Sequence, residues 1–348
     1  MLYVTTRVED DAFTANRALS ENRGPGGGFF VPMQMPSLSP SDLSAMAEKP
    51  FARNMADVIN QLFNTQLDPW ALEFGIGRRP VKTVNLGSRT TVVQTWHNPA
   101  WRFERLAMGV EKAIRQSDQV SDPPADWLVI AARIGVLFGV FGELLHAGAV
   151  SADTPVDVAV PMGNFSAPMA LWYARQWGLP IGTIVVCCNE NGAVWNLLHK
   201  GEIRTDAVAA HTGTPACDYT VPPDLERLIF AALGREETQH YCQVCRRGGT
   251  YYLEAAQLRK LQNGIWVTVV GRQRMESAVS GLYATDGYIP DPYTALAFSG
   301  LCDFRAATGS GRNALLISDE SPAFSFGMIA GCMGMSQSEL KDLLNKQI

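Results

Sequence analysis

A strand–loop–helix–strand unit in the middle of the chain constrains the fold more than any other feature. Residues 156–160 form a short apolar run that predicts a strand, and residues 167–177 predict a helix that ends at Gly178 and Pro180. A second apolar run at 184–188 predicts the next strand. A β-α-β unit implies a parallel sheet with a right-handed crossover. The sequence therefore predicts an α/β protein with an open, mostly parallel sheet and flanking helices.

Other segments add elements on both sides of this unit. Residues 39–62 carry apolar side chains at helical spacing, with Ser41 as the expected N-cap. Residues 81–93 indicate strand structure interrupted at Gly87. Residues 314–317 predict a further strand, and 335–346 a terminal helix.

The composition is that of a soluble globular protein with a large core. Of the 348 residues, 47% are apolar and 18% are charged. The net charge is −5 and no basic stripe is present, so nucleic acid is not an expected partner.

Residues 1–11 lack the apolar region of a signal peptide. The apolar segment 127–145 is long enough to cross a bilayer, but Arg133 and Glu143 interrupt it. We therefore predict a buried core helix and no membrane contact.

Seven cysteines, an odd number in a long chain, argue against a disulfide framework and favour the reducing cytoplasm. Cys242 and Cys245 form a C-x-x-C pair beside His240, a pattern that suits zinc or redox chemistry. A structural zinc site needs four ligands, usually as two spaced pairs. His211 and Cys217 are only loose candidates for the second pair. Chance occurrence is the favoured interpretation, and no metal site is predicted.

The loop inside the central unit is a candidate phosphate site. Gly163 and Asn164 lie where the first strand gives way to the helix N-terminus. In that geometry free backbone N–H groups and the positive end of the helix point at one spot, which suits a phosphate. Glycine and asparagine also occur in such loops only to make the turn. On this feature alone, both interpretations stay open.

Several colinear blocks extend this loop into a resemblance to threonine synthase, a pyridoxal-phosphate (PLP) enzyme of fold type II. Segment 160–202, which contains PMGNFSAPM, GLPI and NENG, is similar to the family's P-T-G-N-F-G-N, M-G-L-P-I and N-E-N-D. Four other segments resemble the motifs Y-x-S-T-R, D-G-G-L-Y-V-P, S-P-S-M-D with E-R-L, and G-Y-x-x-D-P-H-T-A; they are 1–7, 26–32, 214–228 and 287–295.

The resemblance implies a tryptophan synthase beta-like fold. Residues 1–95 would form an N-terminal threonine-synthase-like segment, and 96–348 the large α/β domain. The loop that holds the PLP phosphate in the family would correspond here to Gly163, Asn164, Phe165 and Ser166, with Ser166 in place of a glycine.

The same resemblance implies that the PLP lysine is missing. The family motif F-H-G-P-T-x-x-F-K-D matches 96–105, which reads WHNPAWRFER and keeps His97, Pro99 and Phe103. Glu104 stands at the lysine position, and a carboxylate cannot form the Schiff base that PLP chemistry needs. Glu104 and His97 would thus occupy catalytic positions without covalent PLP binding.

Two further departures concern the rest of the site. The family's small lobe, with its T-S-G-D-T-G loop, has no counterpart between about 105 and 127. The chain instead reaches Ala132-Arg133-Ile134, which matches the end of N-S-I-N-W-A-R-I. The family's T-A-H-P-A-K-F aligns with 319–324, so Asp319 replaces the partner of the pyridine nitrogen. An aspartate can still pair with a protonated pyridine nitrogen.

Two functions follow as hypotheses. The first is a catalytically degenerate threonine synthase-like protein that acts in binding, regulation or assembly. It would keep a phosphate site and bind a phosphate-bearing ligand without covalent PLP. A homo-oligomer or protein partner would cover the face left by the missing lobe.

The alternative is a divergent enzyme of amino-acid metabolism, related to the conversion of O-phosphohomoserine to threonine. It would use PLP-independent chemistry or a non-standard residue, such as Glu104 as a general base. Surface ion pairs of Glu104 with Arg102 and Arg105 are the simpler interpretation of that cluster. Lys112, eight positions beyond Glu104 and about 12 Å further along a helix, would serve only if the pocket had shifted.

Overall fold

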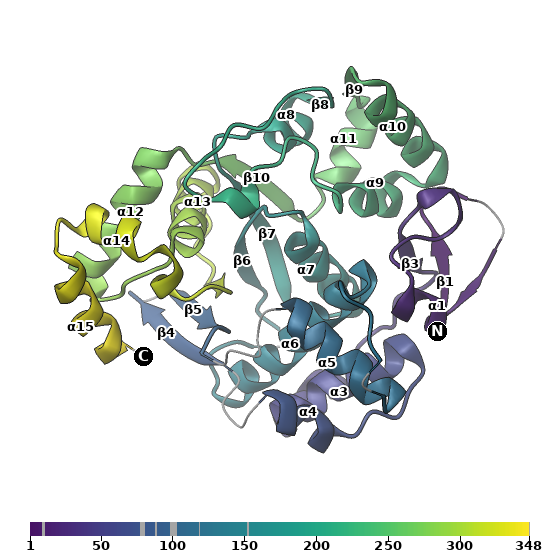
Figure 1. Cartoon of the computed structure of the whole chain (residues 1–348), viewed down its shortest axis with the longest axis horizontal. Helices are drawn as coiled ribbons and strands as arrows, with labels where there is room; N and C mark the ends of the chain where they lie inside the picture. Colours follow the sequence, from purple (N-terminus) through teal and green to yellow (C-terminus); the bar gives the residue numbers. More distant parts are fainter. Residues whose placement is uncertain are drawn as a thin grey trace.

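The computed structural model describes residues 1–8, 11–76, 81–87, 89–97, 103–117, 119–151 and 153–347. At its centre lies a six-stranded sheet with the order β10-β7-β6-β11-β5-β4 (Figure 1). All neighbouring strands run parallel except β4, which pairs antiparallel with β5. The predicted open, mostly parallel α/β sheet is confirmed. Its strands are β4 (Lys82–Leu86), β5 (Thr90–Gln94), β6 (Val156–Pro161), β7 (Ile181–Cys188), β10 (Ile265–Val269) and β11 (Ala314–Ser318).

The central unit forms as predicted. β6 and β7 are parallel neighbours joined by α7 (Ser166–Trp177). Both strands are apolar without interruption because helices cover both faces of the sheet. Val158 and Ile184 point into the core on the α7 side, whereas Ala159 and Val185 belong to the core on the opposite side.

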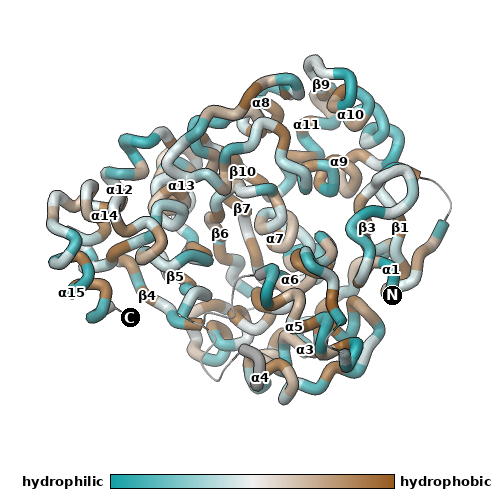
Figure 2. Tube along the Cα trace, viewed as in Figure 1, coloured by the Kyte–Doolittle hydropathy of each residue, from teal (hydrophilic) through white to brown (hydrophobic). Residues whose placement is uncertain are grey.

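Two layers of helices enclose the sheet. The core on one face contains side chains of α7, α6 (Asp126–His146) and α3 (Phe51–Phe63). The core on the other face contains side chains of α12 (Arg272–Asp286), α13 (Pro292–Thr308) and α14 (Phe326–Met333). Figure 2 shows hydrophobic residues along the central strands, with hydrophilic stretches mainly at the periphery. The arrangement is a three-layer α/β/α sandwich.

Helix α6 corresponds to the apolar segment of the sequence. Within the described residues it is the one helix long and apolar enough to cross a membrane. Most of it is buried, including Trp127, Ile134 and Phe141. Its environment is therefore the protein core, as predicted, and not lipid.

The N-terminal part carries its own small antiparallel sheet of β1 (Leu2–Thr5), β2 (Phe13–Thr14) and β3 (Phe30–Pro32). This sheet lies at the edge of the molecule, far from the C-terminus (Figure 1). The border predicted at residue 95 falls just after β5, which is inside the central sheet. The helices of this part are α1 (Ala15–Ser20), α2 (Pro40–Ala47), α3 and α4 (Pro69–Ile76).

The predicted N-cap at Ser41 is wrong. Ser39 caps α2, because its hydroxyl accepts a hydrogen bond from the Asp42 amide while the Asp42 carboxylate accepts from the Ser39 amide. This reciprocal capping box places Pro40 at the first helical position, where its missing N–H costs nothing. Ser41 lies within the first turn.

A short connection leads from α5 (Phe103–Arg115) to α6. The buried Glu111 carboxylate anchors this connection. Glu111 pairs with Arg115 at 2.9 Å and accepts hydrogen bonds from the Ser121 amide and hydroxyl. The chain therefore passes from one helix to the next through residues 116–125, without a second lobe in between. That this reflects the loss of a family lobe stays a prediction.

The remaining elements surround the sheet. β8 and β9 form a two-stranded antiparallel sheet next to α10. The predicted strand at 314–317 and terminal helix at 335–346 are present as β11 and α15. The elements not yet given are α8 (Ala193–Lys200), β8 (Glu202–Arg204), α9 (Leu225–Leu233), α10 (Arg235–Arg247), β9 (Thr250–Tyr252), α11 (Ala255–Leu261) and α15 (Gln337–Gln347).

Candidate functional site

A cavity of about 730 Å³ opens at the carboxyl ends of the parallel strands. In open α/β sheets, ligands bind at this edge, where the order of the strands reverses. Here β6 leads to β7 and β10 on one side, while β11 and β5 lie on the other. The lining residues are Trp96, Glu104, Arg105, Arg133, Val160, Pro161, Met162, Gly163, Asn164, Ser166, Ala167, Ala216, Cys217, Tyr293, Ile317, Asp319, Glu320, Ser321, Ala323 and Phe324.

The predicted phosphate loop forms one wall of this cavity. Gly163 has φ +51° and Phe165 has φ +74°, so the chain turns sharply before α7 begins. The backbone amides of Asn164 and Ala167 and the Ser166 hydroxyl have no hydrogen-bond partner among the described residues. These three unpaired donors lie at a helix N-terminus on residues that line the cavity, an arrangement suited to an anion, and we refer to them as the anion cradle.

Not every residue of the predicted loop contributes to the cradle. The Gly163 amide donates to Cys217 Sγ at 3.4 Å, and the Ser166 amide donates to Asn164 Oδ1 at 3.1 Å. The Phe165 side chain is fully buried and does not line the cavity. It packs in the core beside α7, so its part is to shape the turn.

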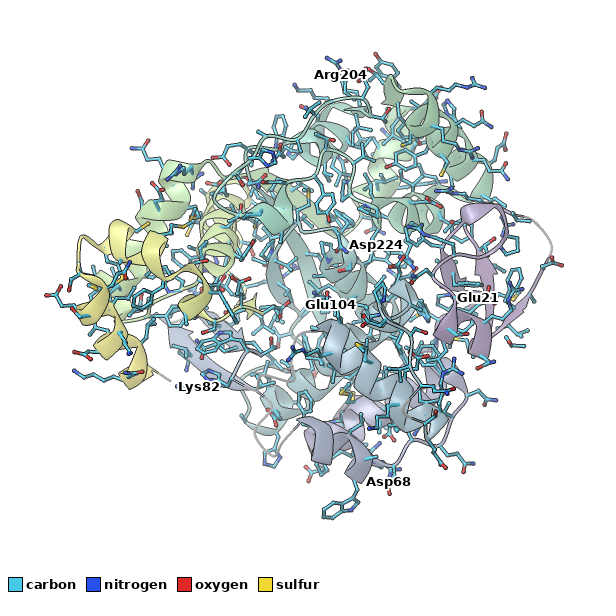
Figure 3. The ribbon with its side chains drawn as sticks, in the orientation of Figure 1. Glu21, Asp68, Lys82, Glu104, Arg204 and Asp224 are labelled. Carbon is cyan, nitrogen blue, oxygen red and sulfur yellow. The ribbon has the colours of Figure 1, made fainter. Side chains whose placement is uncertain are left out.

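Glu104 lies on the first turn of α5 and lines the cavity with an exposed side chain. It makes no ion pair with any described residue. Figure 3 shows Glu104 near the middle of the molecule, whereas Lys82 lies toward its edge. All seven lysines fall within the described residues, and none lines the cavity. Arg102, the other predicted member of the charge cluster, lies outside the described residues.

Asp319 lines the cavity but is already paired. Its Oδ2 lies 2.8 Å from Arg133 Nη1, and its Oδ1 accepts a hydrogen bond from the Thr95 hydroxyl at 3.0 Å. Both charged side chains are largely shielded, with exposed fractions of 18% for Arg133 and 29% for Asp319. A pyridine nitrogen would have to displace this arrangement to reach Asp319.

His97 lies beside the cavity but does not line it. Its ring stacks on Trp96 with 4.0 Å between ring centres, and Nε2 lies 2.7 Å from Gln94 Oε1. Burial, with a smaller effect of Lys82, lowers the pKa of His97. Trp96 stands on the cavity wall instead, and its indole N–H donates to Ser318. The catalytic position predicted for His97 is therefore one residue removed from the wall.

In the sequence, no role was predicted for Arg133, the cation from α6 in this cavity. It appeared there only within a motif and as an interruption of an apolar segment. That interruption was the available signal, because a charge within a buried helix needs a partner. The partner, Asp319, is 186 positions away along the chain.

A polar cluster fixes the turn that lies next to the cradle. The Asp218 carboxylate accepts hydrogen bonds from Asn189 Nδ2 at 2.7 Å, the Thr212 hydroxyl at 2.6 Å and the Thr212 amide at 3.0 Å. Partial burial acts to raise the pKa of Asp218, but the hydrogen bonds from Thr212 and Asn189 outweigh it and the pKa is lowered. The cluster ties the end of β7 to the turn that carries Ala216 and Cys217.

Asp218→Asn should cost about 1–3 kcal/mol of stability at pH 7. The side-chain N–H₂ of the variant would face donors, Asn189 Nδ2 or the Thr212 amide, where the carboxylate now accepts their hydrogen bonds. The lowered folded pKa means that this carboxylate stabilises the fold above its unfolded pKa of about 3.9, and that the contribution fades as the pH falls through the folded pKa. Urea unfolding should thus show a gap between wild type and variant that narrows from pH 7 to pH 3. Asp153→Asn, at an exposed carboxylate, is the control and should show little change at either pH. A gap of equal size at both pH values would contradict the assignment.

The C-x-x-C pair lies away from this cavity, on α10. Cys242 and Cys245 line a separate hollow of about 220 Å³ with Arg7 and Glu226. Burial raises the pKa of Cys242 to about 12 and also raises that of Cys245. Within the described part of the chain, no three His, Cys, Asp or Glu side chains gather as metal ligands.

Comparisons with known proteins agree with the fold and the N-terminal segment. Residues 2–77 match the family model described as threonine synthase N terminus. The human protein "Threonine synthase-like 1" is 30% identical over 168 residues, which cover 44% of this chain and 21% of that protein. Threonine synthase from Corynebacterium glutamicum is 37% identical over 91 residues, which cover 26% of this chain and 19% of the relative. The chain thus spans about a fifth of the length of these curated relatives.

Solved structures match over nearly the whole chain. PLP-bound threonine synthase from Brucella melitensis superimposes with a TM-score of 0.82 at 17% identity, covering 99% of this chain and 94% of that one. The yeast enzyme gives 0.81 at 16% identity, covering 98% and 93%. The fold is that of the type-II PLP enzymes. Together with the N-terminal match and the sequence relatives, it makes the chain similar to threonine synthases in sequence over part of its length and in fold over nearly all of it.

Proposed function

We propose that this protein is a threonine synthase-like binding protein that takes a phosphate-bearing ligand into the cavity without covalent PLP chemistry. The observation that carries the proposal is the composition of the cavity wall. It combines an anion cradle at the start of α7 with Glu104 on α5, and no lysine lines it. One end of the site is suited to a phosphate, and the other lacks the amine that would hold an aldehyde.

PLP fits this site in part. Its phosphate would lie against Asn164, Ser166 and Ala167, where three donors are unpaired. Its aldehyde would find the Glu104 carboxylate, which cannot form an imine. Asp319, the expected partner of the pyridine nitrogen, is held by Arg133 and Thr95. The residues therefore do not fit a covalently bound, catalytically active PLP, and no reaction step is assigned to it.

The biological role that accompanies this site is regulation or assembly in the cytoplasm. Because α5 leads directly to α6, one side of the cavity is formed without a second lobe of this chain. A second copy or another protein would cover that side in the proposed assembly. A divergent enzyme remains the second candidate, since Glu104 reaches the cavity and makes no ion pair with a described residue.

Calorimetry with three related ligands tests the proposal. Pyridoxal phosphate and pyridoxine phosphate differ only in the aldehyde, while pyridoxine lacks the phosphate. We expect the two phosphates to bind with similar affinity and inorganic phosphate to compete with both. Pyridoxine should bind at least about tenfold more weakly, because charge-assisted hydrogen bonds are lost. Much tighter binding of the aldehyde, or equal binding of pyridoxine, would contradict the proposal.

A further inference from the structure

The Arg133–Asp319 ion pair has a consequence for which ligands the cavity accepts. Arg133 extends from α6 and Asp319 follows β11, so the ion pair links this helix to the end of a strand of the central sheet. The Thr95 hydroxyl holds the second carboxylate oxygen at 3.0 Å. The carboxylate is therefore held at both oxygens, and one of them contacts the Nη1 end of a guanidinium that lines the cavity.

A guanidinium in a cavity is the natural receptor for a carboxylate or phosphate, because its N–H groups match the two oxygens. Here Asp319 already supplies such a carboxylate from within the chain. A second anionic group on a ligand would have to compete with Asp319 for the Arg133 guanidinium, and separating this shielded ion pair is costly. Among the residues that the structure describes, the wall carries Arg105 and Arg133 together with the carboxylates of Glu104, Asp319 and Glu320.

We infer that Asp319 is a built-in counter-ion for Arg133 and makes the cavity selective for phosphate monoesters with no second anionic group. The phosphate would bind at the cradle before α7, and the rest of the ligand would be neutral or carry an amine. Amines are favoured by the carboxylates of the wall, such as Glu104. This inference rests on the proposed phosphate site and adds the class of ligand that the site takes.

Two small phosphate esters of matched size test this selectivity by calorimetry. Phosphoethanolamine ends in an amine and phosphoglycolate ends in a carboxylate. Wild-type protein should bind phosphoethanolamine at least about tenfold more tightly. In Asp319→Asn, the competing carboxylate is removed from Arg133, and phosphoglycolate should gain about tenfold in affinity, the size of one charge-assisted hydrogen bond.

Two further variants separate the ion pair from the general charge of the wall. Glu320→Gln removes the same charge one residue further on and should change the ratio of the two affinities less than Asp319→Asn does. The double variant Arg133→Gln/Asp319→Asn lacks the receptor, so the gain for phosphoglycolate should disappear. Equal effects of Asp319→Asn and Glu320→Gln, or a gain that persists in the double variant, would overturn the inference and leave the phosphate site intact. If neither ester binds wild type or Asp319→Asn, both the proposed phosphate site and this selectivity fail.

Discussion

Ser166→Asp should abolish the binding of phosphate esters. Ser166 lines the cavity at the first position of α7, where its hydroxyl has no partner among the described residues. A carboxylate there would sit where the ligand phosphate binds. Two like charges about 4 Å apart repel by about 4 kcal/mol at the dielectric typical of partly exposed sites. We therefore expect a loss of at least about a hundredfold in affinity, measured by calorimetry with phosphoethanolamine.

The stability of the same variant has two opposing contributions, because Ser166 is 6% exposed and a carboxylate there also loses hydration. An acidic side chain near a helix N-terminus is favourable by about 0.3–1 kcal/mol. Ser166→Asn, similar in shape but uncharged, is the matched control. It should keep most of the affinity and show no electrostatic gain in stability. Equal losses of binding in both variants would indicate a steric effect and would contradict an anion site at the start of α7.

Asp224→Ala should destabilise the protein by about 3–5 kcal/mol. Arg227 is fully buried, and its ion pair is with Asp224, which is 4% exposed. Burial lowers the pKa of Arg227 to about 10, so the guanidinium stays charged at neutral pH. Without Asp224 a charge would be left in the core between α9 and the N-terminal sheet. Urea unfolding at pH 7 measures the loss.

A double variant shows whether the buried charge is the cause. Asp224→Ala/Arg227→Met removes the charge together with its partner, and the unbranched methionine can follow the path of the arginine stem. It should recover most of the stability lost in Asp224→Ala. The Arg227 guanidinium also stacks on the Phe29 ring at 4.0 Å, so recovery should be incomplete. If the free energy of unfolding of Asp224→Ala were within about 1 kcal/mol of the wild-type value, the stabilising role of this pair would be contradicted. The Asp224 amide also donates to the Asn164 carbonyl, so the region supports the cradle as well.

Local sequence patterns predicted the parts of the fold that local physics determines. The apolar runs of β6 and β7 and the helix between them follow from periodicity and from Gly178 as a stop signal. The N-cap of α2 was misplaced by two positions because Ser39 and Ser41 are both good capping residues. Only the position of Asp42, three residues after Ser39, distinguishes them.

The residues of the candidate site likewise fall into those that a local motif predicted and those that only the packing of distant elements brings together. The cradle before α7 and the place of Glu104 followed from contiguous motifs. The Arg133–Asp319 pair and the turn with Cys217 are brought to the cavity by the packing of distant elements, which no local pattern encodes. His97 and Phe165 matched family motifs, but their side chains point into the surrounding structure. A motif identifies a backbone position, and the neighbouring elements decide which side chains face the ligand.

We propose above that this threonine synthase-like protein binds phosphate compounds without a Schiff base. The most direct test is to incubate the purified protein with PLP, record its absorption spectrum, reduce it with borohydride and map the peptides by mass spectrometry. The account predicts no internal-aldimine band and no pyridoxyl adduct at a single lysine. A clear band together with an adduct on one specific lysine, such as Lys112, would contradict it and would identify the residue that replaces Glu104.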